Sequence, residues 1–295
     1  MNSSPAAFQP PKIDAPQEYP FTDAHFELLR KLVGRYAGIS LNDTKRQLVY
    51  GRLARRIRAL GLPGFDAYCE LVREEDSAEV ENFINAITTN LTSFFRENHH
   101  FECLAQTVVP MLLKANAASR RIRVWSAGCS TGEEPYSIAM TLLEALGDTS
   151  GWDVKVLATD IDSNVVATAA AGVYPANRQQ GVGEARLKRW FAPAPGMAGA
   201  QGALRVKDEV RDIIRFAPLN LMENWPFKGP FDVIFCRNVV IYFDKATQSR
   251  LFGRYADVLA RHGYLFIGHS ETMFGTCDRF DLIGRTTYRL AGAAR

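Results

Sequence analysis

"VWSAGCSTGEEPYSIAM", residues 124–140, joins a short apolar run to a helical pattern through a turn of small residues, and this stretch decides the fold. A glycine-containing turn between a buried strand and a helix usually presents backbone N–H groups to a phosphate. Here the turn leads directly into Glu133 and Glu134, whose carboxylates would repel a phosphate and attract an ammonium or sulfonium group. The stretch therefore predicts a strand–turn–helix unit with a site for a cationic ligand.

The chain beyond Arg120 alternates short apolar runs with segments of helical periodicity. The apolar runs are residues 121–127, 153–160, 212–219, 231–238 and 263–270. Such runs are typical of strands that are buried on both faces, and the helical segments 133–146 and 244–260 lie between them. The pattern predicts an α/β domain built on a doubly wound, mostly parallel sheet.

Ligands of such sheets bind at the carboxyl ends of the strands, where this sequence has several polar side chains. In chain order these are the turn at 128–134, Asp160 and Asp162, Asn220, Arg237 and Asn238, and His269 and Glu271. Asp160, at the end of the second strand, could accept both hydroxyls of an adenosine ribose. A dinucleotide would use the same acid, but "GCSTGEE" lacks the G-x-G-x-x-G spacing. S-adenosylmethionine fits better, because it combines a ribose with a sulfonium and an ammonium and has no phosphate.

The first third of the chain has a different pattern. A proline-rich stretch to residue 20 is expected to be disordered. Thr22 is a plausible N-cap for a helix that continues to about residue 38, and helical patterns recur at 45–60, 65–72 and 78–87. No strand pattern occurs there. Residues 21–90 are therefore predicted to form a small all-helical domain.

The second of these helices is strongly basic and has no acidic residue between positions 45 and 60. At about 100° per residue, Lys45, Arg52 and Arg56 fall within about 40° of one another, opposite an apolar stripe. Arg55 lies off this stripe. An ordinary solvated face mixes both signs of charge, so we expect Lys45, Arg52, Arg55 and Arg56 to bind an anionic partner, with a merely solvated face as the alternative.

Composition narrows the class of protein. The 295 residues carry a formal net charge of only +3, which does not indicate bulk binding of nucleic acid. No apolar stretch is long enough to cross a membrane and the first 20 residues contain no apolar signal segment, so we expect a cytoplasmic protein without membrane insertion.

Five cysteines without a CxxC pair indicate free thiols. His99 and His100 are adjacent and would diverge by about 100° on a helix, so no metal site is expected.

Six blocks of this sequence, in order, resemble the chemotaxis receptor methyltransferases, the CheR family. The blocks are "TTNLTSFFRENHHF" (88–101), "VWSAGCSTGEEPYSIAM" (124–140), "ATDID" (158–162), "LNL" (219–221), "FDVIFCRNVVIYFD" (231–244) and "LFIGHSE" (265–271). The resemblance covers roughly residues 20–290. It implies an S-adenosylmethionine-dependent protein-glutamate O-methyltransferase, with S-adenosylhomocysteine as the product and the cytoplasmic helical region of chemoreceptors as the substrate.

The resemblance also implies site residues and domain boundaries. The implied cofactor contacts are Asn90, Thr92, Arg96, Glu133 or Glu134, Asp160, Asn220, Leu221, Arg237 and Asn238. Residues 91–120 become a linker and connecting helix, and residues 121–295 a class I methyltransferase domain with a small antiparallel β-subdomain at about 174–211. In some family members this subdomain binds a short tether at the receptor's C-terminus. Whether the subdomain of this chain binds such a tether peptide is left open by the sequence. The Ala/Pro/Gly-rich stretch 192–203 within it is typical of a flexible hairpin connection.

A substrate glutamate needs little help to react with a sulfonium methyl. Its pKa near 4.3 leaves it ionised at neutral pH, so no general base is required. Tyr242 is a candidate for orienting the substrate, and Arg96 for placing the carboxylate or the cofactor. Two alternatives remain: a non-catalytic S-adenosylmethionine-binding module, and a nucleic-acid methyltransferase. The second is weaker, because "CRNV" occupies the place where base-amino methyltransferases usually have an N/D-P-P-Y-like string.

Overall fold

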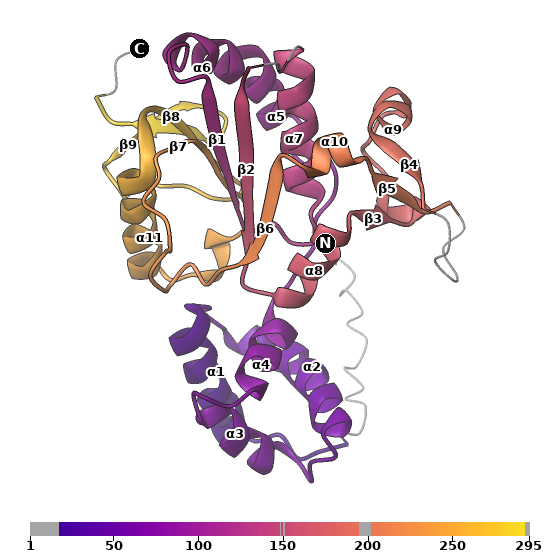
Figure 1. Cartoon of the computed structure of the whole chain (residues 1–295). Helices are drawn as coiled ribbons and strands as arrows, with labels where there is room; N and C mark the ends of the chain where they lie inside the picture. The colour runs from indigo at the N-terminus through magenta and orange to yellow at the C-terminus, as the bar shows by residue number, and fades with distance from the viewer. Residues whose placement is uncertain (1–17, 148, 150, 195–201, 293–295) are drawn as a thin grey trace, which may run out of the picture.

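The structure is a computed structural model that describes residues 18–147, 149, 151–194 and 202–292. A bundle of helices formed by the N-terminal part of the chain lies below an α/β part that contains the large sheet (Figure 1). The expected disordered tail lies outside the described residues as far as residue 17. So do positions 195–201 of the expected flexible connection.

The N-terminal part is all-helical, as predicted. Its helices are α1 (Asp23–Ala37), α2 (Arg46–Ala59), α3 (Phe65–Arg73) and α4 (Glu79–Ile87), with a short 3₁₀ turn, η1 (Asp43–Lys45), before α2. Thr22 caps α1, because its hydroxyl accepts from the backbone N–H of His25 at 3.2 Å. Leu29, Val33 and Leu53 are fully buried in the core that these helices share.

The predicted parallel sheet is present and has seven strands in the order β6-β2-β1-β7-β8-β10-β9. The strands are β1 (Arg121–Ala127), β2 (Asp153–Asp160), β6 (Ile214–Pro218), β7 (Phe231–Cys236), β8 (Leu259–Ile267), β9 (Phe280–Gly284) and β10 (Thr287–Leu290). The first five positions in this order pair in parallel, and β10 pairs antiparallel with both β8 and β9. Every residue of β7 is buried, because β7 lies in the middle of the sheet with helices on both faces.

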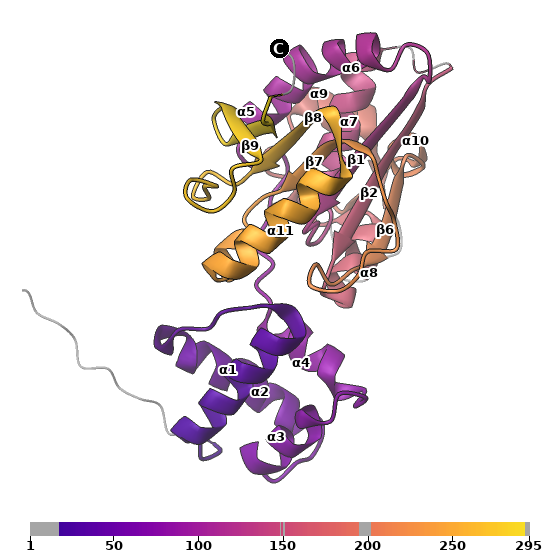
Figure 2. The ribbon, with the colours of Figure 1, turned by 90° about the vertical axis from the view of Figure 1, so that its left-hand side faces the viewer.

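Helices cover both faces of the sheet (Figure 2). α7 (Glu133–Leu146) and a long helix lie on one face; the long helix consists of α5 (His99–Cys103), a π-helical segment η2 (Leu104–Val108) and α6 (Val109–Ala115). α11 (Lys245–Val258) lies on the other face. α8 (Ser163–Ala171) and the short α10 (Asp208–Arg211) lie near β6. Each face therefore has its own apolar core.

A second, smaller sheet projects from the side of the α/β part (Figure 1). Its strands are β3 (Val173–Tyr174), β4 (Phe191–Pro193) and β5 (Leu204–Val206), in the antiparallel order β3-β5-β4. The turn η3 (Ala176–Arg178) and helix α9 (Glu184–Trp190) connect β3 to β4. This insertion is the small antiparallel β-subdomain of the predicted fold class, which the structure confirms.

The helical part is bonded to the loops that follow the strands. The backbone N–H of Ser40 donates to the carbonyl of Tyr242 at 2.7 Å, beside a bridge between Ile39 and Phe243. The side-chain amide of Asn220 donates to the carbonyl of Tyr36, the penultimate residue of α1, at 2.6 Å. These contacts hold the bundle over the carboxyl ends of the strands. In the described part of the chain, no helix has the length and apolarity needed to cross a membrane.

Candidate functional site

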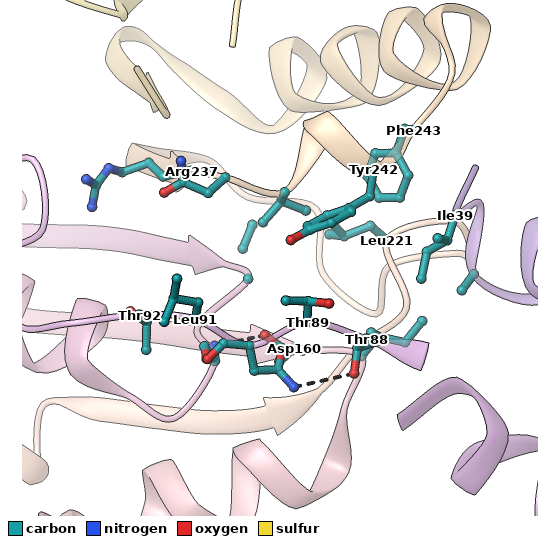
Figure 3. Close-up of a pocket in the computed structure, with 18 of the residues that line it drawn as sticks. Ile39, Thr88, Thr89, Leu91, Thr92, Asp160, Leu221, Arg237, Tyr242 and Phe243 are labelled. Carbon is teal, nitrogen blue, oxygen red and sulfur yellow. Dashed lines mark hydrogen bonds between the residues drawn. The ribbon is translucent and has the colours of Figure 1, made fainter. Parts of the chain in front are cut away.

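A pocket lies where the helical bundle meets the carboxyl ends of the strands (Figure 3). The bundle contributes apolar residues that include Ile39 and Leu41, and residues 88–93 of the linker form another wall. Eleven of the residues singled out in the sequence line the pocket: Lys45, Asn90, Thr92, Arg96, Glu134, Asp160, Asn220, Leu221, Arg237, Asn238 and Tyr242. The strand ends, the linker and the bundle thus meet around one site.

The conformation of the glycine turn after β1 is explained by close packing and does not require a bound phosphate. Gly128 has φ +143°, and a Cβ added there would lie 2.3 Å from Cγ2 of Val239. The backbone N–H of Ser130, in the middle of the turn, donates to Oδ2 of Asp160 at 2.8 Å. That N–H is therefore committed to a carboxylate. This agrees with the inference that the turn does not bind a pyrophosphate.

Asp160, the last residue of β2, is held by backbone groups. Its other carboxylate oxygen, Oδ1, accepts from the backbone N–H of Asp162 at 3.1 Å. Burial raises the pKa of Asp160, while the N–H groups of Asp162 and Ser130 oppose that rise. The side chain lines the pocket, and Figure 3 shows it on the same wall as Thr88 and Thr89. A fixed carboxylate in this place is suited to accept hydrogen bonds from ribose hydroxyls.

The two acids that open α7 have different surroundings. Glu133 is fully buried and pairs with Arg178 of η3, and Thr131 Oγ1 donates to it at 2.7 Å. Glu133 is not among the residues that line the pocket, and its carboxylate binds the β-subdomain; of the two open candidates for the cofactor contact, the geometry favours Glu134. Glu134 does line the pocket. Ser126 Oγ donates to its Oε1 at 2.7 Å, and Nη1 of Arg237 lies 3.0 Å from its Oε2.

Arg237 connects Glu134 to a second carboxylate. Nη2 of Arg237 lies 3.3 Å from Oε2 of Glu97, and the side chains of Arg237 and Glu97 are 2% and 10% exposed. Figure 3 shows that the Arg237 side chain extends away from Tyr242. Burial raises the pKa of Glu134, although the charge of Arg237 and the Ser126 hydrogen bond oppose this. One guanidinium is therefore shared between two buried carboxylates at the back of the pocket.

The linker between the two parts is fixed by Asp162, a residue that also caps α8. Asp162 Oδ2 accepts from Asn90 Nδ2 at 2.7 Å and from Thr88 Oγ1 at 3.0 Å. The hydroxyl of Ser130 donates to the carbonyl of Asn90 at 3.1 Å. Arg96 Nη1 donates to the carbonyl of Leu91 at 2.8 Å, so the guanidinium folds the linker back along the pocket.

The turn after β7 presents Tyr242 to the pocket. Buried Glu271 accepts from the backbone N–H groups of Asn238 at 2.9 Å and Ile241 at 3.2 Å, and these bonds shape the turn. The Tyr242 hydroxyl points into the pocket, toward the side where Thr89 and Asp160 lie (Figure 3). Asn220 lines the pocket, but its amide bonds Tyr36 and its carbonyl oxygen accepts from Met222 N at 3.0 Å. Asn220 therefore also joins the bundle to the strand ends.

The basic stripe predicted on α2 is only partly free. Arg52 donates to the carbonyls of Ile87 at 2.6 Å and Thr88 at 2.5 Å, at the C-terminal end of α4. Arg56 forms two hydrogen bonds, of 2.8 and 2.6 Å, with buried Glu79. The guanidinium groups of Arg52 and Arg56 already bond groups of α4, and the expected binding of an anionic partner by these two residues stays a prediction. Lys45 and Arg55 are exposed, and Lys45 lies at the pocket.

His99 and His100 do not diverge as expected; their ring centroids are 4.1 Å apart. Ligand atoms of Glu97, His99 and His100 lie within 4.8 Å of one another. The carboxylate of Glu97 is already occupied, because His269 donates to both of its oxygens from Nδ1 at 2.8 Å and from its backbone N–H at 3.1 Å. Arg237 adds a positive charge beside it. We therefore do not assign a metal to this cluster.

The wall formed by the bundle and the linker was not predicted from the sequence. Ile39, Leu41, Thr88, Thr89 and Leu91 line the pocket, and no local pattern marks them as site residues. They become part of the site only because the bundle packs over the strand ends. The side chains at the pocket fit S-adenosylmethionine, with the partly buried Asp160 available to ribose hydroxyls and the buried Glu134 available to an ammonium group.

Comparison with known proteins covers both parts of the chain. Residues 24–88 match the all-alpha domain of CheR methyltransferases, and residues 90–289 match their S-adenosylmethionine-binding domain. A probable chemotaxis protein methyltransferase of Rhizobium etli is 49% identical over 255 residues, which cover 86% of this chain and 94% of that protein. The chemotaxis protein methyltransferase of Salmonella typhimurium is 45% identical over 278 residues, which cover 93% of each chain. That of Escherichia coli is 45% identical over 273 residues, which cover 92% of each.

Proposed function

The chain belongs to the CheR methyltransferase family, and from this premise we propose that it methylates glutamate side chains of chemotaxis receptors. The product is a γ-carboxyl methyl ester. The observation that carries the proposal is the pocket at the strand ends, which brings two acids, Asp160 and Glu134, together with Tyr242 and Arg96. The methylation reaction takes place in the cytoplasm and adapts chemotactic signalling.

Each residue of the pocket has a distinct task in this proposal. S-adenosylmethionine supplies an electrophilic methyl group on a sulfonium when it is bound. Asp160 accepts hydrogen bonds from the ribose hydroxyls, and Glu134 receives the ammonium group. Asn90, Thr92, Asn220, Leu221 and Asn238 complete the cofactor walls. Arg237 holds the carboxylate of Glu134 in place through the ion pair between them.

The methyl transfer needs no proton acceptor from the protein. A substrate glutamate is already ionised at neutral pH, and the described residues that line the pocket include no histidine. The protein's contribution is positioning, which can supply about 7 to 11 kcal/mol of the barrier. Tyr242 orients the substrate carboxylate through its hydroxyl, and Arg96 places the carboxylate or the cofactor. The apolar wall from the bundle excludes water, so the opposite charges meet in a dry site.

The receptor partner is anionic and helical. Exposed Lys45 and Arg55 lie on the bundle, which forms one side of the pocket, and could attract the glutamates offered for methylation. In this proposal the β-subdomain is a second receptor-binding surface, for a C-terminal tether peptide. The family match and the names of the relatives give no support to the non-catalytic module or to the nucleic-acid methyltransferase.

One assay tests the proposal. The full chain is incubated with cofactor labelled on the methyl group and with receptor cytoplasmic fragments or RNA, and the product is then hydrolysed in alkali. Carboxyl methyl esters release volatile methanol, whereas methylated bases do not. We expect methanol from the receptor reaction, and at least several-fold less methanol when Asp160→Ala replaces the wild type at low cofactor concentration. Label retained on RNA, or none on either substrate, would contradict the proposal.

A further inference from the structure

Glu97 lies behind the pocket, at the meeting point of the linker, the end of β7 and the end of β8. It has φ +56°, a backbone conformation that non-glycine residues rarely adopt. Its carboxylate accepts from Nδ1 and the backbone N–H of His269 and is paired with Arg237. Such strained residues persist where the surroundings hold them in place, often at functional sites. The backbone conformation and the contacts of Glu97 therefore indicate a role beyond packing of the linker.

The charges behind the pocket form a short chain. Arg237 lies 3.0 Å from Glu134 and 3.3 Å from Glu97, and its side chain is 2% exposed. One guanidinium between two carboxylates leaves a net charge of −1. If Arg237 paired with Glu134 alone, that pair would be neutral and its attraction for a cation would largely cancel.

We propose that Glu97 is a positioning residue that shares the charge of Arg237, so that Glu134 keeps a net negative charge toward the cationic amino-acid end of the cofactor. The inference rests on the proposed function, in which Glu134 receives the ammonium group. Glu97 itself touches neither substrate nor cofactor. It acts through Arg237.

The protonation of Glu97 agrees with this role. Burial by itself would raise the pKa of Glu97, but the hydrogen bond from His269 and the charge of Arg237 together lower it to about 2. The carboxylate is therefore charged at neutral pH. Burial and the charge of Glu97 both raise the pKa of Glu134, and Arg237 and the Ser126 hydrogen bond oppose that rise.

The test compares two ligands on the full-length chain by calorimetric titration. S-adenosylhomocysteine carries the amino-acid group, whereas 5′-methylthioadenosine has the same adenosine and thioether without it. We expect Glu97→Gln to weaken binding of S-adenosylhomocysteine about tenfold and to leave 5′-methylthioadenosine unchanged. Glu97→Asp keeps the charge and should recover most of the affinity. The double variant Glu97→Gln/Arg237→Gln restores the net charge of −1 and should bind S-adenosylhomocysteine more tightly than Glu97→Gln alone.

Glu134→Gln separates the failure of this inference from failure of the proposed function. If Glu134→Gln does not weaken S-adenosylhomocysteine, the assignment of Glu134 in the proposed function is wrong. If it does, while Glu97→Gln has no effect or weakens both ligands equally, only the role of Glu97 is wrong. If Glu97→Gln does not fold, the double variant and Glu97→Asp test the inference in its place. Both keep a net charge of −1 behind the pocket, so a double variant that binds S-adenosylhomocysteine much more weakly than Glu97→Asp contradicts charge sharing.

Discussion

Asp160 and Glu134 are pocket acids whose hydrogen bonds fix them before any ligand arrives. Two backbone N–H groups hold Asp160, and a hydroxyl and a guanidinium hold Glu134. A preorganised acceptor loses little entropy when it binds a ligand. Replacing such a residue should therefore reduce affinity much more than it reduces stability.

Asp160→Ala is expected to weaken cofactor binding by about 1 to 3 kcal/mol, because it leaves ligand hydroxyls without a partner in a buried site. Calorimetric titration with S-adenosylhomocysteine measures this loss. Exposed Asp278 provides a matched control, and Asp278→Ala should bind as the wild type does. Equal affinities for the wild type and Asp160→Ala would remove Asp160 from the site.

Tyr242→Phe is expected to lower kcat with little change in cofactor affinity, because an orienting hydroxyl matters most while the methyl group moves. Steady-state rates with receptor fragments, together with a binding titration, separate the two quantities. Tyr264→Phe is the control, since Tyr264 lies in the core of the sheet. An unchanged kcat would mean that Tyr242 only packs against the bundle.

Helix α2 shows how one element can combine structural and binding residues. Its apolar stripe lies in the bundle core, while Arg52 and Arg56 on an adjacent face bond α4. Arg55 on α2 and Lys45 just before it are exposed, and neither bonds α4. Effects on folding and on receptor binding should therefore separate along the helix.

Arg56→Ala is expected to lower the stability of the helical bundle by about 1 to 3 kcal/mol, because Glu79 would remain buried without its partner. Arg55→Ala, one position earlier and exposed, should stay within about 0.5 kcal/mol of the wild type. Thermal unfolding of the two variants compares them directly. Equal unfolding temperatures for both would contradict the structural role of Arg56.

The double variant Lys45→Ala/Arg55→Ala is expected to raise KM for the receptor and to flatten its salt dependence, because exposed charge pairs are screened within about 8 Å in physiological salt. Each pair contributes only about 0.2 to 1 kcal/mol, so the double variant is the fair test. Initial rates against receptor concentration at two salt levels measure it, and because Lys45 lines the pocket, cofactor affinity is measured for the double variant and for Arg55→Ala alone. If the double variant kept the wild-type KM and salt dependence, Lys45 and Arg55 would not bind the receptor, and the β-subdomain would be the next candidate for the receptor-binding surface.

At the scale of the whole molecule, one buried histidine in the α/β part makes the protein sensitive to acid. His100 is fully buried between the long helix and the turn after β9, with Nε2 bonded to the carbonyl of Arg285 and the hydroxyl of Thr286. Burial, together with the charges of Arg237 and His99, lowers the pKa of His100 to about 3. The folded protein therefore keeps this ring neutral.

Acidification from pH 7 to pH 5 is expected to destabilise the protein. Below an unfolded pKa of about 6.5 the unfolded chain binds a proton at His100 that the folded chain does not, so stability falls as pH drops toward 3. The contribution at pH 5 is about 2 kcal/mol. Glu97 adds to the loss only below its unfolded pKa of about 4.5.

His100→Gln should flatten this dependence, because glutamine does not titrate and can still donate where Nε2 does. Unfolding temperatures of the wild type and the variant at pH 7 and pH 5 make the comparison. A variant that loses as much stability as the wild type over this range would show that other groups cause the acid sensitivity.

Local pattern was sufficient for most of the fold. Strands β1 and β2 and helix α7 have the bounds that the apolar runs and the helical periodicity predicted. A strand buried on both faces and a helix buried along one stripe each leave a pattern of apolar residues that can be recognised over a few consecutive positions. The same reasoning located the acids at the strand ends and excluded a dinucleotide. The resemblance of six blocks added the family, which the matches over residues 24–88 and 90–289 confirm.

Tertiary structure decided what adjacent or similar residues do. Glu133 and Glu134 are neighbours on α7, and only the packing of α7 against the β-subdomain turns Glu133 to Arg178 and leaves Glu134 at the pocket. In the same way, α4 binds Arg52 and Arg56, while the bundle adds an apolar wall to the pocket. The sequence determined which elements form because periodicity is local. It could not determine these partners, because a side chain's neighbour across the fold depends on how whole elements pack.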